Sequence, residues 1–143
     1  MNNALLLVAA NLAMVVLVML VGLRMLFVRI AEMREKRVHP QAAATSLQLA
    51  ARLERVQASD NFRNLFEVPV LFYALSATAL ALGSIPQWLI VGAWGFVALR
   101  YLHSLVQCTY NKVLHRLVAF LSSSLLLVGM WIALLVTLAH AAA

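Results

Sequence analysis

Residues 55–72 read RVQASDNFRNLFEVPVLF and place a group of polar side chains directly before an apolar helix. In a single helix, Asn61, Asn64 and Glu67 are spaced three apart. Arg63 and Glu67 are spaced four apart, so the whole group shares roughly one helical face. Ionisable groups at the end of a membrane span are costly unless they face protein or a water-filled cavity. The stretch therefore predicts a polar site that other helices must cover.

The composition of the chain indicates the solvent in which it folds. Of its 143 residues, 64% are hydrophobic and only 11% are charged, whereas a soluble domain has roughly 25% charged residues. A soluble core of this size cannot hide that excess of apolar surface. We therefore predict an integral membrane protein, and the length fits one domain over residues 1–143.

Four apolar stretches are long enough to cross a bilayer, which requires about 20 residues of helix. The predicted fold class is all-α, a bundle of four transmembrane helices. The first stretch carries its basic flank at its C-terminal end, which is unlike a signal peptide. The spans are expected at about residues 4–28, 65–82, 87–109 and 113–139.

The second span is predicted to be the end of a longer helix over residues 46–82. Thr45 and Gln48 fit a capping box at its start, and no Gly or Pro interrupts the pattern before Pro69. A helix of this length measures about 55 Å at 1.5 Å per residue, so its first part is expected to project into water. Pro69 removes one backbone hydrogen bond and predicts a kink.

The basic residues set the expected orientation. All eleven Lys and Arg lie between Arg24 and Arg116, in two clusters around the connections of spans 1–2 and 3–4, and none lies near either terminus. By the positive-inside rule, both connections are cytoplasmic and both termini lie outside the cytoplasm. The net charge of +6 is thus interpreted as a topology signal, and no nucleic-acid partner is predicted.

Polar residues from several helices are expected to meet at the cytoplasmic end of the bundle, where they would form a cationic site for an anionic ligand. The structural alternatives are an ion pair between Arg63 and Glu67, or arginines that reach toward lipid phosphates. No spacing typical of a metal site occurs, and the single Cys108 excludes an intrachain disulfide. The candidate residues are Arg63, Asn64, Glu67, Arg100, His103, Gln107 and Arg116, with Arg24 as a further candidate.

These motifs resemble those of the MAPEG family, whose members include microsomal glutathione transferases and microsomal prostaglandin E synthase. The resemblance rests on Arg63-Asn64-x-x-Glu67 followed by a proline, on Arg100-x-x-His103, and on Arg116 after them. It covers nearly the whole chain and fits a bacterial-type member in an inner membrane.

The resemblance implies a left-handed four-helix bundle that assembles as a homotrimer in membrane lipid. It also implies glutathione as a cosubstrate, bound between subunits near the cytoplasmic side. Arg116 falls where the transferases place an arginine beside the thiol, and it is the candidate catalytic residue. Further glutathione-contacting positions are occupied by Arg63, Asn64, Glu67 and His103.

Two functions fit these features. The first is a glutathione transferase or peroxidase that acts on lipophilic electrophiles. The second is a non-catalytic scaffold, accessory subunit or lipid-binding protein that keeps the fold, while a channel or transporter is a third class with little room in four spans. The choice between the first two functions depends on three positions at which the prostaglandin synthase pattern has a hydroxyl group and this chain has none. Gln107 and Phe120 stand in place of tyrosines, and Leu117 stands in place of a serine.

Overall fold

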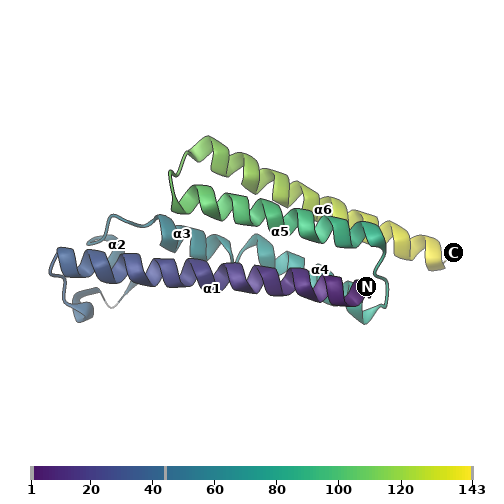
Figure 1. Cartoon of the computed structure of the whole chain (residues 1–143), viewed down its shortest axis with the longest axis horizontal. Coiled ribbons are helices and arrows are strands. Elements are labelled where there is room, and N and C mark those ends of the chain that lie inside the picture. The colour runs from purple at the N-terminus through teal and green to yellow at the C-terminus, as the bar shows by residue number, and fades with distance from the viewer. Residues whose placement is uncertain (1, 44, 143) are drawn as a thin grey trace.

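The computed structural model describes residues 2–43 and 45–142, and its regular elements in that part of the chain are all helices (Figure 1). This confirms the predicted all-α fold class. The elements are α1 (Asn3–Glu35), the 3₁₀ helix η1 (Pro40–Ala43), α2 (Ser46–Ala50), α3 (Gln57–Asn64), α4 (Val68–Ala81), α5 (Gln87–Cys108) and α6 (Val113–Ala142).

Four helical segments are long and apolar enough to cross a membrane: Asn3–Glu35, Gln57–Ala81, Gln87–Cys108 and Val113–Ala141. Large apolar side chains cover their outer surfaces, and Leu125 of α6, for example, is 71% exposed. Long helices that expose apolar side chains in this way fit contact with lipid. The chain is therefore an integral membrane protein with four spanning helices, as predicted.

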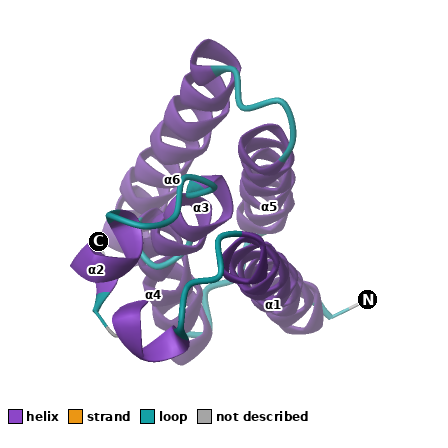
Figure 2. Cartoon of the chain, turned by 90° about the vertical axis from the view of Figure 1, so that its left-hand side faces the viewer, coloured by secondary structure: helices purple, strands orange, loops and turns teal. Residues whose placement is uncertain are grey.

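The four segments lie side by side along one axis (Figure 1). α1 packs against α3, α4 and α5, while α6 packs against α5 and α4, so the segments surround a common core, seen end-on in Figure 2. Both termini lie at the end that holds the turn at residues 83–86, where Gly83 adopts a left-handed φ of 65°. The start of α3 and the α5–α6 loop lie at the opposite end. We call this opposite end the basic end, because the basic clusters of the sequence meet there.

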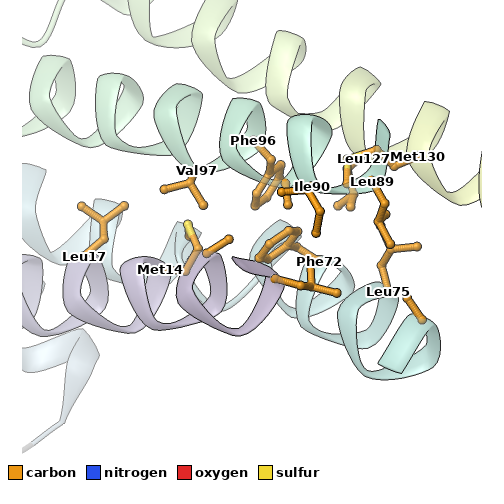
Figure 3. Packing of buried hydrophobic residues seen from close by; sticks show 14 of the residues in the cluster. Met14, Leu17, Phe72, Leu75, Leu89, Ile90, Phe96, Val97, Leu127 and Met130 are labelled. Atoms are coloured by element: carbon orange, nitrogen blue, oxygen red, sulfur yellow. The ribbon is translucent and has the colours of Figure 1, made fainter. Parts of the chain in front are cut away.

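Aromatic and aliphatic side chains fill the centre of the bundle (Figure 3). Phe72 of α4 stacks on Phe96 of α5 with ring centroids 4.7 Å apart, and both side chains are fully buried. Gly92 allows α5 to approach α6, because a Cβ atom at this position would lie 2.9 Å from the sulfur of Met130. Small residues of this kind permit close packing of membrane helices.

The predicted single helix over residues 46–82 is wrong, because α2, α3 and α4 take its place. The predicted capping box of Thr45 and Gln48 does start α2, but that helix ends at Ala50. The first part of the segment therefore does not project into water as one continuous rod.

The break between α3 and α4 confirms the disruption expected at Pro69. This proline occupies the first turn of α4, where its missing N–H is tolerated but a helix continuing from α3 is not. The backbone of residues 65–67 forms tight turns, and Glu67 adopts φ −96° and ψ −93° immediately before α4. The break changes which side of the segment each polar residue faces.

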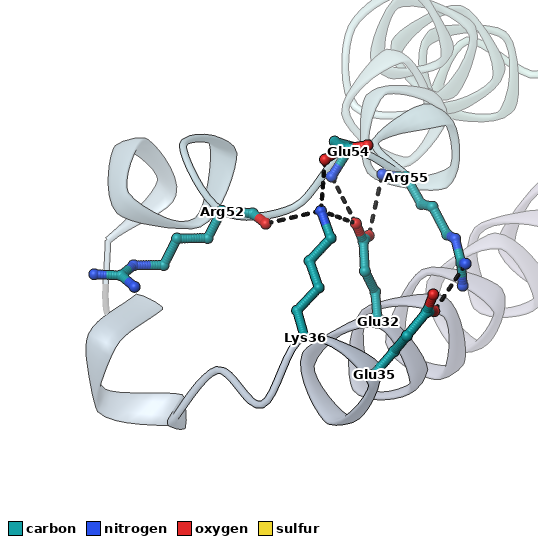
Figure 4. Close-up of polar contacts among 6 residues, drawn as sticks. All are labelled: Glu32, Glu35, Lys36, Arg52, Glu54 and Arg55. Atoms are coloured by element: carbon teal, nitrogen blue, oxygen red, sulfur yellow. Dashed lines mark hydrogen bonds and ion pairs between the residues drawn. The ribbon is translucent and has the colours of Figure 1, made fainter.

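The break at residues 51–56 has a different cause, which the sequence did not reveal (Figure 4). Glu32 of α1 is 1% exposed, and its carboxylate accepts hydrogen bonds from the backbone N–H groups of Glu54 (2.7 Å) and Arg55 (3.1 Å). In a continuous helix these groups would donate to carbonyls four residues earlier. Lys36 pairs with Glu32 at 3.1 Å and with Glu54 at 2.8 Å, and the carboxylates of Glu54 and Glu32 raise the pKa of Lys36.

We call the contacts of Glu32, Lys36, Glu54 and Arg55 the α1–α3 clamp. Two backbone hydrogen bonds and the Lys36–Glu54 ion pair join the end of α1 to the segment before α3, while the Lys36–Glu32 pair lies within the end of α1. Hydrogen bonds to a charged and buried acceptor are among the stronger contacts in proteins. The clamp therefore fixes where α3 begins.

Replacement of Glu32 tests the clamp. We expect Glu32→Ala to lower the free energy of unfolding by about 1–3 kcal/mol, because two partly buried N–H groups lose their acceptor. Glu35→Ala is the matched control, since the Glu35 carboxylate is 59% exposed and pairs only with the Arg55 guanidinium, a contact worth at most about 1 kcal/mol. Thermal unfolding of both variants in detergent is the measurement, and equal losses would contradict the role of Glu32.

Candidate functional site

Four of the predicted site residues line one pocket at the basic end, between α3, α5 and α6. The pocket has a volume of about 330 Å³ and also contacts Asp60, Val113, Leu117 and Phe120. One wall is polar and carries both the Arg116 guanidinium and the Asp60 carboxylate, while Leu117 and Phe120 make another wall apolar. We call it the interhelical pocket, and the four predicted residues in its lining are Asn64, His103, Gln107 and Arg116.

Hydrogen bonds connect the polar wall across the three helices. The amide of Asn64 on α3 donates to the side-chain oxygen of Gln107 on α5 at 3.3 Å. His103 contacts the backbone carbonyl of Arg116 through Nδ1 at 3.0 Å, which requires the N–H to be on Nδ1 and leaves Nε2 as an acceptor in a neutral ring. His103 Nε2 is buried and has no hydrogen-bond partner among the described residues. A ligand with a donor group would satisfy it.

Arg116 is held by the loop that precedes α6. Its Nη1 donates to the side-chain oxygen of Asn111 at 3.0 Å. Asn111 has a left-handed φ of 48°, and its backbone N–H donates to the carbonyl of Val106 at 2.8 Å. Asparagine tolerates this conformation better than most residues. The loop thus fixes one edge of the guanidinium and leaves its other donors available to the pocket.

Arg100 lies deeper than its predicted partners and does not line the pocket. It is fully buried. The alternative that this arginine reaches toward lipid phosphates is therefore wrong. Its guanidinium lies over the rings of Phe96 (5.3 Å) and Phe120 (5.0 Å), and none of its three nitrogens has a hydrogen-bond partner among the described residues. Cation–π contacts stabilise a desolvated cation by about 2 kcal/mol, which does not replace its missing acceptors.

Besides Arg100, two further predicted site residues lie outside the interhelical pocket. Arg63 lines a separate cavity on another side of α3, together with Arg29 and Arg55. Glu67 is exposed in the break before α4, and no ion pair joins it to Arg63 in the described part of the chain. The expectation of one shared face fails because α3 ends at Asn64, so Glu67 no longer follows the helical spacing.

The further candidate Arg24 has a structural contact instead. Its guanidinium donates to the backbone carbonyl of Cys108 at the end of α5. Beside it, Asn61 is fully buried, accepts from the hydroxyl of Ser104 at 3.3 Å and donates to the sulfur of Cys108 at 3.4 Å. Sequence reasoning missed Ser104, although its position four residues after Arg100 and three before Gln107 places it near the same helical surface. These contacts hold α3 against α5 and so position Asn64.

The fold and the pocket together define a class of protein: an integral membrane four-helix bundle with a polar pocket where its helices end. A sequence model of the MAPEG family matches residues 6–136, so the chain belongs to the MAPEG family. Comparisons with curated proteins and with solved structures gave no significant match.

Two substitutions of Asn111 test the left-handed backbone of the loop that holds Arg116. Asn111→Gly removes the acceptor of Arg116 but suits the left-handed backbone, whereas Asn111→Ala removes the acceptor and also strains the backbone. Because the left-handed conformation costs an L-residue roughly 1–2 kcal/mol, we expect the alanine variant to be the less stable of the two. Thermal unfolding in detergent measures the difference, and equal stability would contradict a left-handed backbone at Asn111.

Proposed function

We propose that the chain is a glutathione-dependent transferase or peroxidase that acts on lipophilic electrophiles at the cytoplasmic face of the membrane. The observation that carries this proposal is the composition of the interhelical pocket. Arg116 and His103 line the same cavity, next to apolar Leu117 and Phe120, and the buried Nε2 of His103 has no hydrogen-bond partner among the described residues. Such a pocket suits a polar, anionic ligand together with an apolar one.

The pocket residues fit glutathione by their chemistry. Glutathione carries two carboxylates, an ammonium group, two peptide bonds and a thiol, so it offers both acceptors and donors. Arg116 would receive an anionic group, while Asn64 and Gln107 carry amides that both donate and accept. Arg100, with no acceptor among the described residues, adds positive potential behind the rings of the pocket. Glutathione, when bound, supplies the thiol nucleophile.

Arg116 is the proposed catalytic residue. A free thiol has a pKa of about 8.5, and a neighbouring positive charge favours its thiolate form. His103 orients the site through its contact with the Arg116 carbonyl, and Asn111 fixes the guanidinium edge. The apolar wall of Val113, Leu117 and Phe120 is contributed by α6, whose outer surface is apolar, so an apolar substrate could arrive from the bilayer.

We further propose that the protein is a homotrimer whose subunits complete the site. The resemblance to members of the MAPEG family supports this assembly. Native mass spectrometry from detergent is expected to release trimers. Release of monomers alone would contradict both the assembly and a site shared between subunits.

The proposed location is an inner membrane with the interhelical pocket on the cytoplasmic side and both termini on the other side. The support is the concentration of Lys and Arg near Arg24–Arg63 and Arg100–Arg116, interpreted by the positive-inside rule. Both termini lie at the end away from these clusters (Figure 1), so one orientation satisfies the rule for the whole chain.

One observation favours a second candidate function, a non-catalytic scaffold, accessory subunit or lipid-binding protein. Gln107, Leu117 and Phe120 all line the interhelical pocket, and these are the positions where the prostaglandin synthase pattern has hydroxyls. A pocket without those hydroxyls has fewer groups to bind glutathione or to stabilise its thiolate. The two candidates differ in whether turnover depends on Arg116.

Substitution of Arg116 separates the two candidates. We expect Arg116→Ala to lower the rate of conjugation of a lipophilic electrophile by about 10²–10³, the typical cost of removing one charged contact from a reacting group. Lys112→Ala is the matched control, because Lys112 is an exposed cation of the same loop, and it should retain full activity. Turnover that survives in Arg116→Ala would refute the catalytic role, and absence of turnover in the unmodified protein would favour the scaffold.

A further inference from the structure

Three arginines line one cavity that adjoins the interhelical pocket at Asp60 of α3. The cavity has a volume of about 110 Å³, and we call it the arginine cavity. Arg29 comes from α1, Arg63 from α3 and Arg55 from the connection before α3. Met25 and Leu53 supply part of its apolar lining. The cavity thus combines positive charge with an apolar floor.

The charges of the arginine cavity are not balanced within the described part of the chain. Arg55 has a counterion, because its guanidinium pairs with Glu35 at 2.8 Å. Arg29 and Arg63 have no ion pair among the described residues, and Asp60, which also lines the cavity, forms none with either arginine. With Arg55 paired, Arg29 and Arg63 face the single carboxylate of Asp60, so the lining keeps a net positive charge that a bound anion would balance.

The position of the cavity, beside apolar surface, indicates that its ligand is amphipathic. Met25 lies one turn before Arg29 on α1, on the side of the apolar span. Phe66, which is 55% exposed, lies in the break after α3, and its ring packs on Phe62, whose own ring lies beside Gly22 of α1. Apolar surface therefore continues from the two arginines toward the middle of the bundle. A ligand with an anionic group joined to an apolar body matches this sequence of surfaces.

We propose that the arginine cavity binds the phosphate group of an anionic phospholipid, with the acyl chains lying along the apolar surface near Met25 and Phe66. Basic pockets between membrane helices on the cytoplasmic side are suited to such head groups. The volume of the cavity accommodates a phosphate group but not a larger polyanion. Asp60 lines both this cavity and the interhelical pocket, but the lipid site uses none of the residues on which the proposed function rests, so the inference does not depend on that function.

Native mass spectrometry of the protein in detergent tests the proposal. Phosphatidylglycerol and phosphatidylcholine with the same acyl chains are added in equal amounts, and bound lipid is counted. We expect a preference of about 30-fold for phosphatidylglycerol, from two arginine contacts near the membrane surface. Arg29→Gln combined with Arg63→Gln should reduce the preference to less than about threefold. Each single variant should give a preference between that of the double variant and that of the unmodified protein, which keeps the test available if the double variant does not fold.

The matched control is Arg34→Gln combined with Arg37→Gln, which removes the same charge from exposed positions near the end of α1. It should keep the preference, and an equal loss in the control would overturn the site. No preference for phosphatidylglycerol in the unmodified protein would also overturn the site. If, in addition, the double Arg29 and Arg63 variant loses its oligomer, the anion that faces these arginines comes from a second copy of the chain. Displacement of the lipid by millimolar inorganic phosphate would indicate a site for free phosphate and would overturn the proposal that the ligand is a phospholipid.

Discussion

The carboxylate of Glu32 lies against the backbone N–H groups of Glu54 and Arg55, and the rest of the basic end depends on this contact. A buried carboxylate is stable only when charged or strongly polar partners surround it. Here the partners are backbone groups that would otherwise continue a helix, so the contact ends one segment and starts α3 at Gln57. The start of α3 decides which of its side chains face α5. Asn61 and Asn64 do so, and they meet Ser104, Cys108 and Gln107.

The arrangement of α3 separates two kinds of cationic surface. The interhelical pocket receives Arg116 from α6 and lies against His103, while the arginine cavity receives Arg29 and Arg63 from the other side. Arg100 belongs to neither surface directly, because the rings of Phe96 and Phe120 cover it. A buried cation without an acceptor is stable only if the surrounding field or a further partner compensates it.

The sequence was sufficient for the parts of the fold that depend on composition and periodicity. Four apolar helices, the disruption at Pro69 and the capping box at Thr45 followed from such patterns, and the structure contains them. The single helix over residues 46–82 failed because Glu32, more than twenty residues earlier, supplies the competing hydrogen bonds. For the site, the sequence named Asn64, His103, Gln107 and Arg116 as candidates, and all four line the interhelical pocket. The failure of Arg63 and Glu67 to join them came from the same helix breaks, which only the packed chain reveals.

The central claim is that Arg116 and its neighbours form a site for a thiol that loses its proton on binding. Calorimetric titration of glutathione into the purified protein in detergent, repeated in two buffers of different ionisation enthalpy, measures binding and proton release together. The account predicts saturable heat and the release of close to one proton at neutral pH, because Arg116 favours the thiolate. Absence of saturable heat, or binding with the same heat in both buffers, would contradict it.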